Sequence, residues 1–284
     1  MNKLSLKEND TLFNNQFKIL KVIGNGGFSF VYHVKYLNMR DFAIKEFFIS
    51  KYFQRAEDKK SVLFSKESNC KSQYSFKHNF FNEAILMKSF CHPNILSSFG
   101  YFEENNTIYN VMPLLKGITL SEYIEYKGKL SEDEALSIIK NLSLAVKYLH
   151  SKKICHFDIK PNNVLLQNGS PILIDFGLSY DYNRIDTKGS RIRSISPGYA
   201  ALELFENNGV NRFSPATDIF GLGATLYAML TGTNPPSLKS IWHGALYRPL
   251  KSNSMQTKMA IKTAMQILMP RRFSCVDQFL QALP

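Results

Sequence analysis

Residues 154–177 constrain the fold of this 284-residue chain more than any other stretch. They contain two short apolar runs, Asn163–Gln167 and Pro171–Ile174, separated by Asn168 and Gly169. Asn-Gly between apolar runs is a strong indicator of a β-hairpin, because both turn positions need a positive φ that these residues adopt readily. The sequence therefore predicts a rigid two-stranded platform at this point.

Polar side chains flank both strands of the predicted hairpin. His156, Asp158, Lys160 and Asn163 lie at or before the start of the first strand, and Asp175 follows the second. The hairpin is expected to bring Asp158, Asn163 and Asp175 to one end of the platform. Carboxylate and amide oxygens suit a hard cation such as Mg2+, which also keeps phosphate as a ligand. The pattern therefore predicts a magnesium site that handles phosphate.

The spacing of these residues matches two known motifs. His156 to Asn163 reads H-x-D-x-K-x-x-N, and Asp175 opens D-F-G. The stretch resembles the catalytic core of the protein kinase family. The resemblance covers the chain from about Phe17 to Leu283. Within the family, the chain most resembles the soluble, eukaryotic-like Ser/Thr kinases of bacteria.

The resemblance implies an α+β, bilobal protein kinase fold. A small, mostly antiparallel β N-lobe with one main helix is expected at about residues 1–111. A hinge at 112–117 would lead to a larger, mostly helical C-lobe at 118–284. The length of the chain is sufficient for two lobes with a substantial core.

Composition and cysteine placement favour a cytoplasmic protein. The N-terminal segment lacks the apolar region of a secretory signal, and the best apolar run, Leu222–Leu230, is far too short to span a membrane. The four cysteines show no C-x-x-C spacing, which argues against a zinc site and a disulfide framework. They are Cys70, Cys91, Cys155 and Cys275. We interpret Cys155, beside the catalytic motif, as a small buried hydrophobe.

The net charge of +12 is compatible with nucleic acid, an anionic membrane surface or acidic protein partners. Lysine and arginine are spread along the chain, without a basic stripe interleaved with aromatic residues. We therefore interpret the charge as a solvated basic surface that also favours nucleotide phosphate. Specific nucleic-acid binding is not expected.

A glycine-rich turn is predicted within residues 17–36, which read as two strands. Gly24 and Gly26 occupy the first two glycine positions of the kinase pattern G-x-G-x-x-G-x-V, Ser29 replaces the third, and Val31 completes it. Glycine lets the backbone approach closely, so amides here are expected to cover phosphates.

Lys45 lies in a predicted strand at Asp41–Phe48 and matches the lysine of V-A-I-K. The resemblance implies that it contacts the α- and β-phosphates and pairs with Glu83, on a helix expected to begin near Phe76. The intervening residues 50–75 are polar and lysine-rich, so we interpret them as a surface insertion. Glu67, within this insertion, is the alternative partner of Lys45.

The segment after residue 108 resembles the strand and hinge that bind adenine in kinases. Met112 would lie at the back of the pocket. The Pro113 carbonyl would accept from the adenine amino group, since proline offers only its carbonyl, and the Leu115 amide would donate to the ring. The resemblance implies three apolar contacts with the base: Val31, Ala43 and Leu165.

The resemblance also assigns the chemistry. Asp158 would accept the proton of the attacking hydroxyl, and Lys160 would steady the γ-phosphate of ATP. Asn163 and Asp175 would hold Mg2+, with Mn2+ as an alternative. Lys160 and Ser196, in SPGY, indicate serine or threonine as the acceptor.

Three further assignments come from the C-terminal half. Asp218 matches an aspartate that anchors the backbone of the catalytic loop. The resemblance implies that Arg272 pairs with Glu203. Residues 214–236 read as a buried helix ended by Gly232.

Phe157 replaces the arginine of H-R-D, a cation that normally requires a phosphate on the activation segment. Without that cation we expect activity not to depend strictly on phosphorylation there. Three candidate autophosphorylation sites remain in the segment: Thr187, Ser190 and Ser194.

The main prediction is an active Ser/Thr protein kinase with protein substrates. A pseudokinase, acting as a nucleotide-binding scaffold, is the alternative suggested by Ser29, Phe157 and Leu202, although none of these removes a metal-binding or proton-accepting group. A small-molecule phosphotransferase would usually lack SPGYAALE, and a nucleic-acid-binding module would explain the charge but not the motifs. With no appended sensor domain expected, a regulatory protein partner, the insertion or the activation segment would bring the activating signal.

Overall fold

The structure is a computed structural model that describes residues 4–64, 70–181, 196–205 and 213–284. The chain divides into two compact units. The first, which we call the β unit, comprises Met1–Cys91 and Leu96–Lys116. The second, the helical unit, comprises His92–Ile95 and Gly117–Pro284.

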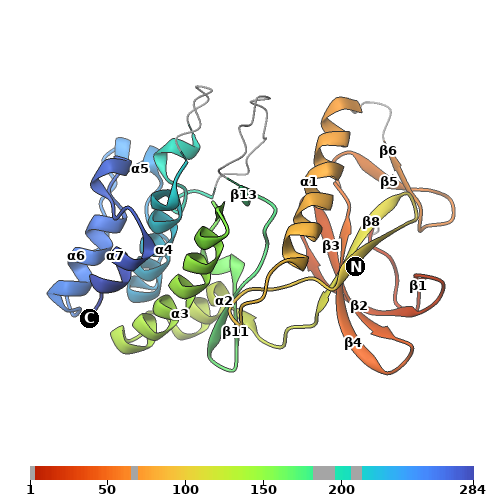
Figure 1. The fold of residues 1–284 in the computed structure, drawn as a ribbon, viewed down its shortest axis with the longest axis horizontal. Coiled ribbons are helices and arrows are strands. Elements are labelled where there is room, and N and C mark those ends of the chain that lie inside the picture. Colours follow the sequence, from red (N-terminus) through yellow and green to blue (C-terminus); the bar gives the residue numbers. More distant parts are fainter. Residues whose placement is uncertain (1–3, 65–69, 182–195, 206–212) are drawn as a thin grey trace. The chain divides into compact units, whose positions relative to one another are not determined.

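The β unit contains a six-stranded sheet in the order β1-β2-β3-β4-β8-β7, with every neighbouring pair antiparallel (Figure 1). Its strands are β1 (Thr11–Leu12), β2 (Phe17–Asn25), β3 (Ser29–Tyr36), β4 (Arg40–Phe47), β7 (Gly100–Glu104) and β8 (Thr107–Pro113). Along β3, buried Phe30, Tyr32 and Val34 alternate with more exposed residues. This period of two places one face of the strand in the core.

The single described helix of the β unit is α1 (Cys70–Lys88), which carries Glu83. It starts before Phe76, so the predicted start of this helix is wrong. The early part of the helix has few apolar residues, and apolar periodicity was the signal on which the prediction depended.

The interpretation of residues 50–75 as a surface insertion is wrong for the part that the structure describes. Two short strands, β5 (Phe53–Arg55) and β6 (Val62–Phe64), form an antiparallel hairpin before α1. Phe53 and Val62 are 2% and 1% exposed, respectively. The hairpin is therefore part of the core of the β unit, although strands of three residues are too short to show alternation in the sequence. Glu67 lies outside the described residues.

The helical unit contains six α-helices among the described residues. They are α2 (Leu120–Lys127), α3 (Glu132–Ser151), α4 (Pro215–Thr231), the short α5 (Leu238–Trp242), α6 (Met255–Ala264) and α7 (Val276–Gln281). Short 3-10 helices occur at η1 (Pro161–Asn163), η2 (Leu202–Leu204) and η3 (Met269–Arg271). The strands are β9 (Ile118–Thr119), β10 (Ile154–Cys155), β11 (Val164–Gln167), β12 (Ser170–Leu173) and β13 (Tyr180–Asp181).

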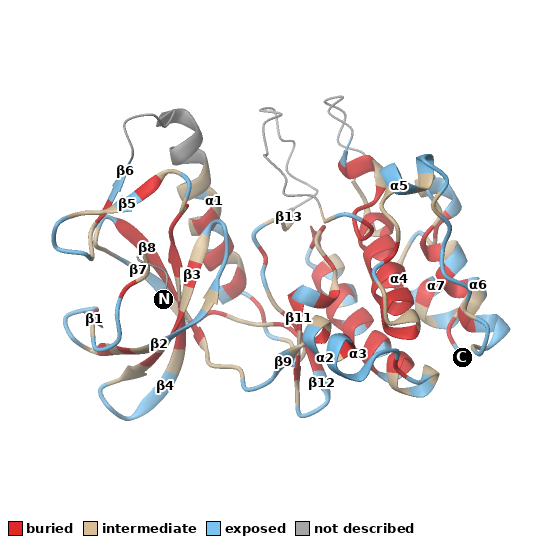
Figure 2. Ribbon diagram, turned by 180° about the vertical axis from the view of Figure 1, so that it is seen from behind, coloured by how far each residue is buried: buried red, intermediate tan, exposed pale blue. Residues whose placement is uncertain are grey.

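Helix α4 forms the centre of this unit and is buried from Ala216 to Leu230, as Figure 2 shows in red. The Ser214 side chain caps its N-terminus, and Gly232 ends it with a left-handed conformation at φ 68°. The prediction of a buried helix ended by Gly232 is thus confirmed. A Cβ atom at Gly221 would lie 2.9 Å from Cβ of Ile159, so the absence of a side chain lets the loop that contains Ile159 pack directly on the helix.

The predicted hairpin is present as β11 and β12, within one residue of the expected bounds. Its turn residues Asn168 and Gly169 have φ of 52° and 79°, the conformation that favoured Asn-Gly. Ile174 N donates to Asn163 O at 2.9 Å, so the polar ends of the two strands lie side by side. Among the helices of the described residues, none has the length and hydropathy needed to cross a membrane.

Candidate active site

The carboxylate of Asp158 is the centre of a hydrogen-bonded cluster in the helical unit. Its Oδ2 accepts from Lys160 Nζ and from Asn163 Nδ2, both at 2.8 Å. Its Oδ1 accepts from Ser196 Oγ at 2.7 Å. Lys160 Nζ also donates to Ser196 Oγ at 2.7 Å, which closes a ring of contacts. Four residues that the sequence analysis singled out are thus brought together.

The backbone of the catalytic loop is held by Asp218 of α4. Its two carboxylate oxygens accept from His156 N at 2.9 Å and from Phe157 N at 2.8 Å. His150 Nε2 lies 2.8 Å from Asp218 Oδ2. Burial alone would raise the pKa of Asp218, but the hydrogen bonds from His150 and the loop outweigh it, and the pKa is lowered. The predicted anchoring by Asp218 is confirmed, whereas the sequence analysis missed His150, which no motif distinguishes.

His156 supports Asp158 from within the core. Its ring is fully buried, and its Nδ1 accepts from Asp158 N at 3.2 Å. The ring also makes an edge contact with Phe176, with centroids 5.1 Å apart. Burial lowers the pKa of this imidazole.

Asn163 and Asp175 lie at neighbouring strand ends of the β11–β12 hairpin. Asn163 Nδ2 donates to the backbone oxygen of Asp158 at 2.9 Å as well as to its carboxylate. Both bonds use the amide nitrogen, so Oδ1 is the atom of this side chain that suits a cation. Asp175 is exposed and has a positive φ of 65°. An amide oxygen and a carboxylate at neighbouring strand ends are the kinds of ligand that a hard divalent cation prefers.

In the β unit, Lys45 Nζ lies 2.7 Å from Glu83 Oε1, and both side chains are largely buried. The ion pair expected from the sequence is therefore present. Lys45 Nζ also lies 5.8 Å from the centroid of the Phe80 ring, one turn before Glu83 on α1.

The residues predicted to contact the nucleotide base occupy adjacent strands. Val31 pairs with Lys45, and Ala43 pairs with Met112, so these four side chains share one face of the sheet. Ala43 and Met112 are buried. The predicted hinge residues also belong to the β unit. Pro113 ends β8, and Leu115 follows it. Leu165 lies on β11 of the helical unit.

The predicted glycine turn joins β2 to β3. A Cβ atom at Gly24 would lie 3.2 Å from Cβ of Val31, its partner on β3, so this position favours glycine. Gly26 N donates to Ser29 O at 2.9 Å, which closes the turn.

The remaining predicted contacts lie in the helical unit. Arg272 forms two hydrogen bonds with the Glu203 carboxylate, at 2.7 and 3.0 Å, so that predicted pair is confirmed. Phe157 packs on Phe213 with ring centroids 5.0 Å apart, in an apolar cluster that includes Ala200 and Leu204. Thr187, Ser190 and Ser194 lie outside the described residues.

The sequence matches the family description "Protein kinase domain" over residues 17–278. The chain belongs to the protein kinase family. A solved structure described as "PpkA-294 apo form" is similar over 99% of both chains, with 26% sequence identity and a TM-score of 0.83. The predicted α+β protein kinase fold is thereby confirmed.

Curated proteins similar to this kinase domain are named serine/threonine-protein kinases. The probable serine/threonine-protein kinase zyg-1 of Caenorhabditis briggsae is 32% identical over 78% of this chain and 28% of its own length. Serine/threonine-protein kinase PknA of Nostoc sp. is 28% identical over 96% of this chain and 48% of its own length. This chain thus spans less than half the length of these relatives. Protein kinases in general use ATP and a divalent metal ion and act on protein substrates.

Proposed function

We propose that the chain transfers the γ-phosphate of ATP to serine and threonine hydroxyls of protein substrates, and that it also phosphorylates itself. The observation that carries this proposal is the cluster around Asp158, in which Lys160, Asn163 and Ser196 all bond to one carboxylate. Phosphoryl transfer depends mainly on positioning and charge stabilisation, and this cluster supplies both.

Asp158 Oδ1 is the atom proposed to accept the proton of the acceptor hydroxyl. The other oxygen, Oδ2, is held by Lys160 and Asn163, which fix the plane of the carboxylate. Oδ1 already receives a hydroxyl, that of Ser196, at 2.7 Å. An incoming serine or threonine hydroxyl would make the same kind of bond and be aligned for attack.

Lys160 and Lys45 are the proposed phosphate-binding cations. Lys160 Nζ lies within the Asp158 cluster, where it would steady the γ-phosphate. Lys45, oriented by Glu83, would contact the α- and β-phosphates. The backbone amides near Gly24 and Gly26 would cover the phosphates.

Asn163 and Asp175 are the proposed metal ligands, with Mg2+ as the main candidate and Mn2+ as the alternative. When bound, such an ion neutralises negative charge on the phosphates. The role of the chain is to hold the amide oxygen of Asn163 and the carboxylate of Asp175 at adjacent strand ends.

The adenine base would be held by the apolar face formed by Val31, Ala43 and Met112, together with Leu165. The Pro113 carbonyl and the Leu115 amide would bond to its polar edge. We further propose that the protein is cytoplasmic, that it acts on protein substrates, and that a regulatory protein partner controls it.

The test uses γ-labelled ATP with Mg2+, the purified chain and myelin basic protein as a generic acceptor. Transfer by the wild type and loss of at least about 100-fold in Asp158→Asn would support the proposal. Analysis of the labelled residues would then separate serine and threonine from tyrosine.

The same experiment tests the alternative. If neither protein transfers label while nucleotide still raises the melting temperature, the proposal is wrong and the pseudokinase interpretation replaces it. Binding of nucleotide without turnover is the behaviour expected of a scaffold.

A further inference from the structure

Glu46 follows Lys45 on β4 and has no part in the proposed mechanism. Successive side chains of a strand point to opposite faces, so Glu46 lies on the side of the sheet away from Lys45. Its side chain is 0% exposed. The carboxylate accepts from Tyr32 Oη at 2.6 Å, from Tyr109 Oη at 3.1 Å, and from Arg55 Nη1 and Nη2, each at 2.7 Å.

These donors come from different elements of the β unit. Tyr32 lies on β3 and Tyr109 on β8, the two strands that flank β4. Arg55 belongs to the β5–β6 hairpin. Burial raises the pKa of both phenols, and the Glu46 charge raises it further, so both remain hydrogen-bond donors at any physiological pH. One carboxylate thus joins three strands to the hairpin.

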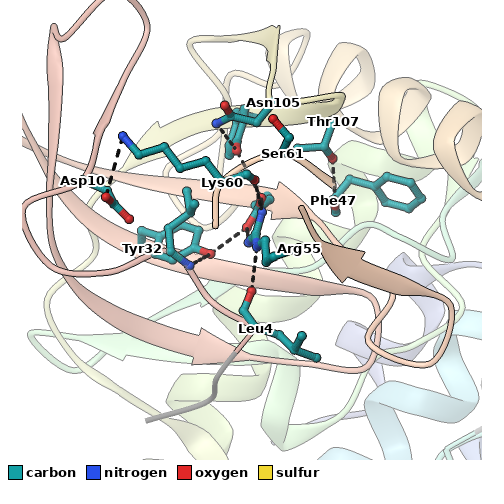
Figure 3. A network of polar contacts seen from close by, with 12 residues as sticks. Leu4, Asp10, Tyr32, Phe47, Arg55, Lys60, Ser61, Asn105 and Thr107 are labelled. Atoms are coloured by element: carbon teal, nitrogen blue, oxygen red, sulfur yellow. Dashed lines mark hydrogen bonds and ion pairs between the residues drawn. The ribbon is translucent and has the colours of Figure 1, made fainter. Parts of the chain in front are cut away.

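The guanidinium of Arg55 makes further contacts around this carboxylate. Its Nε donates to Leu4 O at 2.8 Å, and its Nη1 donates to Lys60 O at 2.7 Å. Figure 3 shows the Arg55 side chain directed towards Leu4. The planar fork of arginine makes all these bonds at once, which a lysine ammonium cannot do.

The same hairpin also contacts the helix that carries Glu83. Phe53 of β5 packs edge-on against Phe47 of β4, with centroids 5.3 Å apart. Phe47 packs on Phe80 of α1 at 5.4 Å. Because Phe80 lies one helical turn before Glu83, the hairpin supports the helix of Glu83 as well as the strand of Lys45.

We propose that Arg55 is a positioning residue for phosphoryl transfer. Through its two bonds to Glu46 it fixes strand β4, and thereby holds Lys45 where the Lys45–Glu83 pair can bind phosphate. This inference rests on the proposed function. A buried ion pair is weak evidence for a contribution to stability, because desolvation offsets much of the attraction, so a positioning role accounts better for it.

The test is a double-mutant cycle between Arg55→Met and Glu83→Gln, measured as the rate of phosphate transfer. Arg55→Met removes the guanidinium and keeps an unbranched stem about as long as the aliphatic part of arginine. In the wild-type background we expect it to lower kcat by about 10-fold to about 100-fold. In the Glu83→Gln background, where the ion pair is already lost, we expect a further loss below about twofold.

Two controls separate positioning from unfolding. Arg40→Met removes an arginine charge from an exposed position on β4, the strand of Lys45 and Glu46, and should keep the wild-type rate. Arg55→Lys keeps the charge but lacks the planar guanidinium. Relative to Arg55→Met, it should restore most of the lost melting temperature. It should restore less than half of the lost log kcat. All variants are assayed well below their melting temperatures.

Several results would overturn the proposal: wild-type kcat in Arg55→Met, an equal loss in both backgrounds, or full recovery of the rate in Arg55→Lys. If the wild type itself fails to transfer phosphate, the proposed function fails separately. The cycle is then measured on the Kd of a fluorescent ATP analogue. Non-additive changes in Kd support the positioning role, and additive changes overturn it.

Discussion

The His156 imidazole holds the backbone of Asp158, the proposed catalytic base. Its Nδ1 accepts from the Asp158 amide, so the neutral ring carries its proton on Nε2, and a second proton would remove that acceptor. The ring is buried and its pKa is lowered. The folded chain therefore requires the neutral form of His156.

This requirement predicts a loss of stability in mild acid. Below the ordinary histidine pKa of about 6.5, the unfolded chain binds a proton that folded His156 resists, so this contribution is fully present above pH 6.5 and is lost as the pH falls. The slope from one such group reaches at most about 1.4 kcal/mol per pH unit. Urea unfolding of the wild type and of His156→Phe, from pH 7 to pH 5, should show a smaller slope in the variant.

His243→Phe is the matched control, since it removes an exposed imidazole. It should retain the wild-type pH dependence. Identical slopes in wild type and His156→Phe would contradict the assignment of a neutral, buried His156.

Motif spacing was sufficient to predict that Lys45 pairs with Glu83 and that Asp158 and Asn163 lie together, because the kinase motifs contain particular residue types at fixed intervals. Glu46 was not identified as a structural residue. In the sequence it is one of several charged residues in its strand, and its hydrogen-bond donors come from parts of the chain that no local pattern connects to it.

The β5–β6 hairpin is the element that departs most from the sequence prediction. Its turn is polar: Asp58 Oδ1 accepts from Lys60 N and Ser61 N, each at 2.8 Å. Only a few apolar residues mark the strands. A composition rich in lysine and serine therefore concealed a hairpin whose Phe53 is part of the core. The β11–β12 hairpin, in contrast, was predictable because Asn-Gly specifies its turn.

Phe53→Ala should lower the free energy of unfolding by about 3–5 kcal/mol, because it leaves a cavity among Phe47, Phe48 and Phe64. Leu63→Ala, in the same hairpin but 48% exposed, should change it by less than about 0.5 kcal/mol. Denaturant titration of both variants measures the difference. Equal effects would mean that the hairpin does not pack as described.

For the whole molecule, the division into two units was only partly accessible from the sequence. His92–Ile95 lies with the helical unit, where Leu173 N donates to Asn94 O at 2.8 Å and Asn94 Nδ2 donates to Pro171 O at 2.7 Å. Such contacts between distant parts of the chain leave no local periodicity. The kinase resemblance supplied the general fold because it depends on motifs spread over the full length.

Regulation is also a property of the whole molecule. Phe157 packs in an apolar cluster with Phe213 and Leu204, so this position needs no phosphate to balance a charge. We therefore predict that a variant with alanine at Thr187, Ser190 and Ser194 keeps at least about a third of the wild-type rate on an external substrate, a change of less than about 0.7 kcal/mol in activation free energy. Steady-state kinetics measure this rate.

The comparison variant is Phe157→Arg, which reintroduces the cation at the buried position. It should lose most of its activity, because a charge is placed among apolar side chains. Complete loss of turnover in the triple alanine variant, with an unchanged melting temperature, would contradict the prediction.

The contacts of Leu4 and Leu6 give the irregular segment before β1 an unexpected property. The Leu6 amide donates to Tyr32 Oη at 3.1 Å, and Leu6 is 2% exposed. Amides outside helices and strands usually exchange their hydrogens with water quickly, since local opening there requires little free energy. Here the Leu6 amide is bonded to a phenol that itself donates to Glu46, so we expect its exchange to require that the Leu6–Tyr32 hydrogen bond opens. Its exchange rate in heavy water therefore reports local opening on the face of the sheet opposite Lys45.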